Sequence, residues 1–111
     1  MDLAGDSGSN ILITEDIDRA VKNADYIYTD VWTSMGQEEE AARRKKVFED
    51  YRITIDMMKK TSQDCMVMHC LPAHRGEEID ADVIDSDRSI VFDQAENRLH
   101  VQKAIMCALM S

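Results

Sequence analysis

The sequence predicts an α/β fold: a three-layer, mostly parallel four-stranded sheet with helices on both faces, equivalent to a Rossmann-like half-domain. Short apolar runs alternate along the chain with longer segments of helical pattern, which is typical of βα units. The short runs are apolar at nearly every position, as in parallel strands covered on both faces. The 111 residues show no internal repeat or linker, so we expect one domain.

Four short runs are rich in β-branched, aromatic or methionine side chains and are the expected strands. They are residues 11–14 (ILIT), Tyr26–Thr29 (YIYT), Met66–His69 (MVMH) and 89–92 (SIVF). Because the runs do not alternate strictly between polar and apolar residues, we expect helices to cover both faces of the sheet.

The segments between and after these runs carry helical spacing and capping signals. Asp16 and Thr54 each precede apolar residues and can cap short helices that end near residues 23 and 60. Glu38–Phe48 has glutamates in its first turn and basic residues later, which complements the helix dipole. Residues 95–110 place small and aliphatic side chains on one stripe, so we expect the chain to end in a helix.

The charge balance excludes several classes of partner. Asp and Glu number 22 against 13 Lys and Arg, which gives a formal net charge of −9. This acid excess argues against nucleic acid and membrane surfaces, because both require a basic face. No apolar run is long enough to span a bilayer, and the first residues lack a signal-peptide pattern. The three cysteines follow no disulfide framework, so we expect reduced thiols and a cytoplasmic location.

The loop after the second run has the chemistry of an amino-acid site. An open parallel sheet binds ligands beyond the carboxyl ends of its strands. Asp30 closes this run and suits an ammonium group, and the following Ser34-Met35-Gly36 loop leads into a helix. Backbone amides at a helix N-terminus suit a carboxylate. The two features together predict a site for an amino acid.

The third run ends in the motif His-Cys-Leu-Pro (residues 69–72). If the strands are neighbours, the thiol of Cys70 lies within reach of Asp30 and can accept or relay a proton from an amine. A buried strand cysteine beside a hydrogen-bonded histidine is the plain structural alternative. Pro72 is the only proline, and we expect a cis peptide bond before it. The spacing of His and Cys matches no zinc pattern, so we expect no metal.

These residues carry a resemblance to the ornithine carbamoyltransferase family. DVWTSMGQE (30–38) resembles the family's ornithine loop, HCLP (69–72) its catalytic motif, and FDQAENR (92–98) its closing motif. The likeness begins near residue 11 and covers the second half of the family's ornithine-binding domain. It implies that residues 1–111 form a single partial domain, without a counterpart of the family's carbamoyl-phosphate domain and its phosphate loop.

The resemblance implies a role for each matching residue. Asp30 and Cys70 would be the catalytic pair that assists loss of the δ-ammonium proton. The residues expected to contact ornithine are Asp30, Ser34, Met35, Cys70 and Leu71. Those expected to face carbamoyl phosphate are His69, Cys70, Leu71 and Arg98. The implied reaction gives citrulline and phosphate and uses no cofactor, because positioned donors stabilise the oxyanion.

The resemblance also implies partners and a context. The complete enzyme would bind L-ornithine and carbamoyl phosphate, would include the missing N-terminal domain, and would serve arginine biosynthesis or the urea cycle. The first strand and helix of the family's domain have no counterpart here, which leaves a sheet edge unpaired. We therefore expect a homo-oligomer, and we expect the isolated chain to be inactive.

Two other interpretations remain open on the residues alone. The chain can be a non-catalytic module that binds an amino acid or another protein. It can also be an acidic signalling domain similar to a receiver, with Asp30 as the phosphorylated group. The lack of an acidic pair after the first run argues against the receiver.

Overall fold

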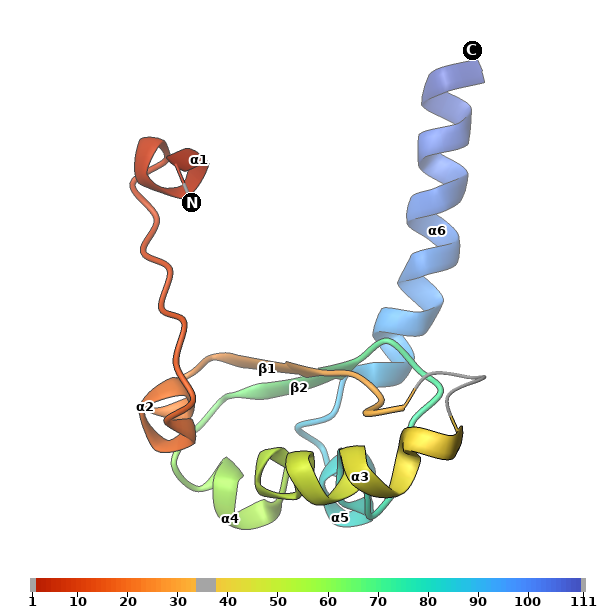
Figure 1. Ribbon diagram of the computed structural model, residues 1–111. Helices are drawn as coiled ribbons and strands as arrows, with labels where there is room; N and C mark the ends of the chain where they lie inside the picture. The colour runs from red at the N-terminus through yellow and green to blue at the C-terminus, as the bar shows by residue number, and fades with distance from the viewer. Residues whose placement is uncertain (1, 34–37, 111) are drawn as a thin grey trace.

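The computed structural model describes residues 2–33 and 38–110. Its elements in chain order are α1 (Asp2–Asp6), α2 (Ile17–Val21), β1 (Tyr26–Thr29), α3 (Glu38–Phe48), the 3-10 helix η1 (Glu49–Tyr51), α4 (Ile55–Met58), β2 (Met66–His69), α5 (Ala81–Ile84) and α6 (Val91–Met110). Figure 1 shows α3, α4 and α5 on one side of the two strands, whereas α6 and the segment with α1 extend away from them.

The two strands form a parallel sheet whose register places both carboxyl ends at the same edge. Thr29 pairs with His69 at this edge. On the other side of β2, Ser89 forms a single parallel bridge with Val67. The Val67 N–H and carbonyl bond to the 88–90 segment at 2.7 and 3.0 Å. β2 therefore has a hydrogen-bonded neighbour on each side, β1 on one and the segment at Ser89 on the other.

The expected count of four strands is not confirmed, because the sheet has two strands over the described residues. β1 and β2 confirm two of the four predicted runs. Residues 11–14 are in no strand, and Ile11, Leu12 and Ile13 are 60%, 52% and 76% exposed. A strand needs a neighbour for its N–H and C=O groups, and the described part of the chain pairs no strand with this segment.

The fourth predicted run divides between a bridge and a helix. Ser89 keeps one strand-like contact, but α6 begins two residues later at Val91. The Gln94 N–H donates to the Ile90 carbonyl at 2.9 Å, which closes the first turn. Helix formation therefore extends back from the expected start at residue 95 and takes over the end of an apolar run that resembles a strand.

The sheet is packed on one face rather than on both. In β1, Ile27 is 9% exposed, whereas Tyr26 and Tyr28 on the opposite face are 65% and 58% exposed. The core lies under the packed face and consists of Val21, Ile27, Ile53, Met57, Met58, Cys65, Val67, Ile79, Val83, Ile84 and Val91. The three-layer arrangement expected from the sequence is therefore reduced to one covered face within the described residues.

Predicted helix caps are present at two helices. Asp16 Oδ1 accepts from the Arg19 N–H at 3.0 Å, and Thr54 Oγ1 accepts from the Met57 N–H at 3.1 Å. The helix predicted over Glu38–Phe48 is confirmed with the same bounds. α4 ends at Met58, two residues before the expected end. In the described part of the chain, no helix has both the length and the apolar character that crossing a membrane requires.

Arg88 fixes the entry to β2. Its guanidinium donates to main-chain carbonyls and to one hydroxyl of the segment between α4 and β2, at 2.8 to 3.3 Å. The acceptors are the carbonyls of Met58, Ser62 and Cys65 and the hydroxyl of Thr61. Because Arg88 directly precedes the bridge at Ser89, this arrangement secures β2 and its neighbour as one unit.

Candidate active site

The shared edge of the two strands brings an acid and a thiol into contact. Asp30 follows β1 and Cys70 follows β2, and their strands end in register. Cys70 Sγ donates to Asp30 Oδ1 at 2.8 Å. The same oxygen accepts from the Val31 N–H at 2.7 Å. The structure therefore joins the two residues that the sequence singles out for proton transfer.

This contact sets the charge state of the pair. The hydrogen bond from Cys70, followed by that from the Val31 amide, holds the pKa of Asp30 below its ordinary value. Burial raises the pKa of the Cys70 thiol, and the carboxylate of Asp30 raises it further. The pair therefore consists of a carboxylate and a protonated thiol at neutral pH.

The turn after Cys70 is sharply shaped. The Leu71–Pro72 peptide bond is cis, which confirms the expectation drawn from the single proline. Leu71 has a φ of 54°, a left-handed conformation that is uncommon for a residue with a Cβ. Its N–H donates to His69 Nδ1 at 2.8 Å. The side chain of His69 thus holds the backbone of the residue two positions later.

His69 is turned into the protein and not toward the open side of the site. Its side chain has no exposed surface, and its Nε2 lies 3.0 Å from Glu78 Oε1. Both ring nitrogens therefore have partners inside the fold. The expectation that His69 faces carbamoyl phosphate stays a prediction. In this arrangement the two ring nitrogens contact Glu78 and the Leu71 amide.

A cavity of about 310 Å³ opens beside the thiol. It is lined by Tyr28, His69, Cys70, Gln94, Ala95 and Arg98. Because the side chain of His69 is fully buried, only its main chain can face this space. Arg98 thus lies at the same cavity as Cys70, although the two residues are far apart in the sequence. Sequence reasoning missed Tyr28, whose one signal was its position two residues before Asp30.

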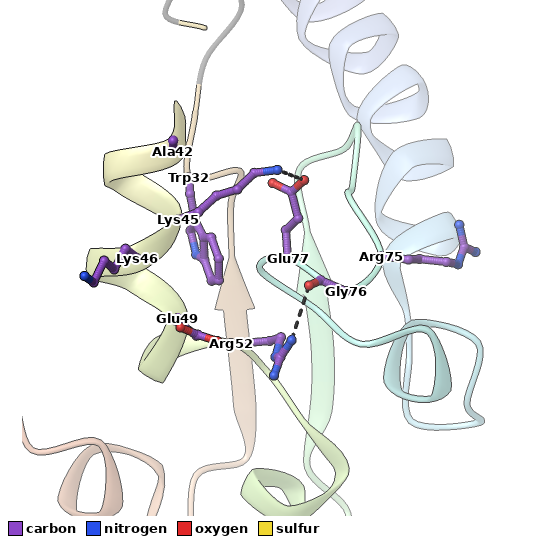
Figure 2. A pocket seen from close by; sticks show the side chains of 9 residues that line it. All are labelled: Trp32, Ala42, Lys45, Lys46, Glu49, Arg52, Arg75, Gly76 and Glu77. Atoms are coloured by element: carbon purple, nitrogen blue, oxygen red, sulfur yellow. Dashed lines mark hydrogen bonds and ion pairs between the residues drawn. The ribbon is translucent and has the colours of Figure 1, made fainter. Parts of the chain in front are cut away.

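The α3 side of the site holds a larger cavity of about 550 Å³, shown in Figure 2. Trp32 reaches between α3 and the strands, and Lys45 reaches across to Glu77 at 2.5 Å. Arg52 donates to the Gly76 carbonyl at 3.3 Å. Arg75 points away from this space and binds Asp85. Most of the cationic side chains that line this cavity already have partners within the protein, so the cavity offers little positive charge to a ligand.

Two expected ornithine contacts, Ser34 and Met35, lie outside the described residues. Asp30, Cys70, Leu71 and Arg98 lie within them and gather at the carboxyl edge of the sheet. Over the described residues, no group of His, Cys, Asp and Glu is arranged to hold a metal ion. The geometry thus provides a thiol–carboxylate pair and a shaped turn beside a cavity that is lined by the thiol and an arginine.

Comparison with known families fits this arrangement. Residues 1–109 match the family described as aspartate/ornithine carbamoyltransferase, Asp/Orn binding domain. The chain belongs to this family. The resemblance seen in its three motifs is thereby confirmed, and the relatives of this carbamoyltransferase-family chain are transferases.

Two relatives illustrate how much of the family's chain is present. The chain is 57% identical over 109 residues to the ornithine carbamoyltransferase of Oceanobacillus iheyensis, covering 98% of this chain and 34% of the relative. It is 55% identical over 107 residues to the anabolic ornithine carbamoyltransferase of Pyrococcus furiosus, covering 96% and 34%. This carbamoyltransferase-family chain therefore spans about a third of the length of the curated relatives that it matches.

Solved structures of the family agree with the fold. The ornithine carbamoyltransferase from Pyrococcus furiosus superposes with a TM-score of 0.87 at 55% identity, covering 95% of this chain and 34% of that one. The anabolic enzyme from Campylobacter jejuni gives a TM-score of 0.90 at 39% identity, covering 98% and 36%. The α/β class predicted for this family member is therefore confirmed, although its strand count is not.

Proposed function

We propose that the chain is the ornithine-binding part of an ornithine carbamoyltransferase, in which the carbamoyl group of carbamoyl phosphate moves to L-ornithine. The observation that supports this most is the 2.8 Å contact between Cys70 and Asp30 at the shared end of two parallel strands. The family match supports the substrate class. The products are citrulline and phosphate.

The proposed chemistry starts with removal of a proton from the δ-ammonium group of ornithine. Asp30 is ionised and Cys70 is protonated, so the thiol proton can pass to Asp30 as the sulfur takes the ammonium proton. The neutral amine nitrogen then attacks the carbonyl carbon. A C–N bond forms, the C–O bond to phosphate breaks, and phosphate leaves with the electron pair. The proton that the attacking nitrogen loses passes to the leaving phosphate.

Other groups at the cavity bind and orient the substrates in this proposal. The guanidinium of Arg98 contacts the carbamoyl phosphate, and donors around the carbonyl oxygen stabilise its developing charge. The carbonyl of Leu71 accepts from the carbamoyl amine. The backbone of Ser34 and Met35 holds the α-carboxylate of ornithine, and Asp30 holds its α-amino group. No cofactor takes part.

The proposed cellular setting follows from the same proposal. The remaining two thirds of the family's chain supply the phosphate-binding domain, and copies associate into a homo-oligomer. The protein works in the cytoplasm, where its three thiols stay reduced, in arginine biosynthesis or the urea cycle.

The test measures binding and transfer separately. We expect the 111-residue chain to form no citrulline above background from ornithine and carbamoyl phosphate. Addition of the complementary part of the Pyrococcus furiosus enzyme is expected to restore transfer. Asp30→Asn is expected to abolish the restored activity, whereas Asp25→Asn, which removes an exposed acid just before β1, leaves it intact.

The outcomes distinguish the proposed function from its alternative. Citrulline formation by the chain alone would contradict the proposal that another domain must supply the phosphate-binding groups. Binding of ornithine in calorimetry, with no transfer in any mixture, would instead support a non-catalytic amino-acid-binding module.

A further inference from the structure

Glu78 is a buried acid that the proposed chemistry does not use. It is fully buried, as is the side chain of His69. Its Oε1 accepts from the His74 N–H at 2.6 Å and lies 3.0 Å from His69 Nε2. Its Oε2 is buried without a hydrogen-bond partner in the described part of the chain, 3.8 Å from His74 Nδ1. A buried carboxylate is costly unless it is hydrogen-bonded, so its presence requires a reason.

The hydrogen bonds of His69 fix which of its nitrogens carries the proton. The Leu71 N–H donates to Nδ1 at 2.8 Å, so Nδ1 is an acceptor and has no proton. Nε2 therefore carries the proton and donates it to the carboxylate of Glu78. Because the carboxylate can only accept, it selects this neutral tautomer over the one with a proton on Nδ1.

The selected tautomer in turn holds the turn that carries the thiol. Leu71 has a φ of 54°, and its N–H needs the acceptor at Nδ1 to remain satisfied in this conformation. The His69 N–H is held separately by Gln94 Oε1 at 3.1 Å. Cys70 lies between these two fixed residues, and its thiol is placed 2.8 Å from Asp30.

We propose that Glu78 is a positioning residue for the site: by fixing the tautomer and orientation of His69, it fixes the Leu71 amide and thereby the place of the Cys70 thiol. The proposal rests on the proposed function for its purpose. Its structural content is the chain of hydrogen bonds from Glu78 through His69 to Leu71. Glu78 itself does not contact the cavity that Cys70 lines.

The first measurement uses the unaltered chain. Nitrogen-15 NMR of the His69 ring at neutral pH is expected to show a protonated Nε2 and an unprotonated Nδ1. A proton on Nδ1, or a doubly protonated ring, would overturn the proposal, because the Leu71 N–H would then have no acceptor. This measurement requires no variant and therefore does not depend on the folding of one.

Variants of Glu78 test whether the acid causes this state. Glu78→Met fills a similar volume but offers no acceptor, and we expect the Leu71 amide to exchange with solvent roughly tenfold faster or more. Glu78→Gln keeps an oxygen at the position of Oε1, and we expect exchange within about twofold of the unaltered chain. Ile79→Val is the matched control, because it changes the neighbouring fully buried residue without touching His69.

Cys70 reports the effect at the site. In a Cys107→Ser background, which removes the exposed thiol of α6, iodoacetamide labelling of Cys70 is followed by mass spectrometry. We expect Glu78→Met to raise the labelling rate about fivefold or more, because the thiol is no longer held against Asp30, whereas Glu78→Gln and Ile79→Val leave it unchanged. Equal rates in Glu78→Met and the control would overturn the proposal.

These readouts separate the positioning role from the proposed function. None of them uses ornithine or carbamoyl phosphate. Failure of the chain to support carbamoyl transfer would contradict the proposed function and leave the tautomer, exchange and labelling results in place. Failure of the labelling and exchange results would contradict the role of Glu78 and leave the proposed reaction unaffected.

Discussion

The region around β2 and the C-terminal helix α6 are similarly rich in apolar residues, yet their burial is opposite. Val67 and Ile79 have no exposed surface, whereas Val101 and Ile105 in α6 are 56% and 52% exposed. Figure 1 shows α6 leaving the sheet after its first turns. The comparison teaches that an apolar pattern alone does not decide burial, which depends on contacts with segments elsewhere in the chain.

The hydrogen bonds explain the difference. β2 has β1 on one side and the bridge at Ser89 on the other, and Arg88 secures its entry. In α6, Val91 is buried and Gln94 is half-buried, but the positions from Ala95 onward are exposed. Substitutions in the two regions are therefore expected to differ most where a buried side chain is removed.

A pair of identical substitutions measures the contrast directly. Ile79→Ala removes a fully buried side chain, and we expect it to lower the free energy of unfolding by about 2–5 kcal/mol. Ile105→Ala removes the same atoms from an exposed position, and we expect a change below about 0.5 kcal/mol. Urea denaturation followed by circular dichroism measures both. Equal losses would show that α6 is packed in solution.

Self-association is the second test of the exposed helix. α6 carries an apolar stripe (Val101, Ala104, Ile105 and Ala108), and over the described residues no strand pairs with the outer edge of β1. We therefore expect a dimer or larger oligomer, in which copies pair edges or exchange α6. Ile105→Lys is expected to weaken association by roughly tenfold or more, because burial of this side chain is lost. Gln102→Lys adds the same charge at a polar position beside the stripe and serves as the control.

Sedimentation velocity at micromolar concentration measures this association. The net charge of −9 opposes it, but salt screens exposed charges beyond about 10 Å. A single monomeric species in the unaltered chain would contradict the role assigned to the stripe.

The effect of the Asp30 carboxylate on the pKa of Cys70 can be measured by removing the charge of Asp30. Burial raises the pKa of Cys70 first and the Asp30 carboxylate raises it further, so Asp30→Asn lowers this pKa without returning it to the ordinary value. We expect labelling of Cys70 by iodoacetamide near pH 8 to rise severalfold, because a larger fraction is thiolate. Asp25→Asn is expected to change nothing.

The raised pKa of Cys70 also predicts how the stability of the fold changes with pH. The folded chain keeps the Cys70 proton as the pH rises past the ordinary thiol pKa, whereas the unfolded chain loses it. This contribution to stability is complete below the ordinary value and is lost as the pH rises toward the folded one. A labelling profile with its midpoint at or below the ordinary pKa of a thiol would contradict the assignment.

The smallest expected effect concerns a helix cap under the core. Thr54→Ala removes the acceptor of the Met57 N–H, and Met57 and Met58 of this helix are buried. We expect a loss of about 1 kcal/mol in the free energy of unfolding, with Thr54→Ser restoring most of it. Chemical denaturation of the two variants side by side makes the comparison, and equal losses would show that the hydroxyl does not cap the helix.

The sequence predicted the contact between Asp30 and Cys70 better than it predicted the number of strands. β1, β2, α3, both caps, the cis bond and the meeting of Asp30 with Cys70 are local signals or follow from parallel strands. The runs at 11–14 and 89–92 are as apolar as the two observed strands. Whether such runs pair depends on neighbours that composition does not reveal.

Glu78 could not be found for a related reason. It follows Glu77, and nothing in the sequence separates the buried glutamate from the half-buried one beside it. Only the path of the chain after Pro72 brings Glu78 into contact with His69 and with the His74 amide. The inward orientation of the His69 side chain depends on that contact, so the residues next to His69 in the sequence could not predict it.

The bond between Gln94 and the His69 amide gives α6 the mechanics of a lever. Its short arm, from Val91 to Gln94, is attached to the end of β2 at 3.1 Å. Its long arm runs from residue 94 to residue 110, which is about 24 Å at 1.5 Å per residue. We expect a tilt of the long arm to reach the strand end that carries the thiol through this hydrogen bond. Cys107, exposed near the end of α6, is a suitable place for a probe that tests this expectation.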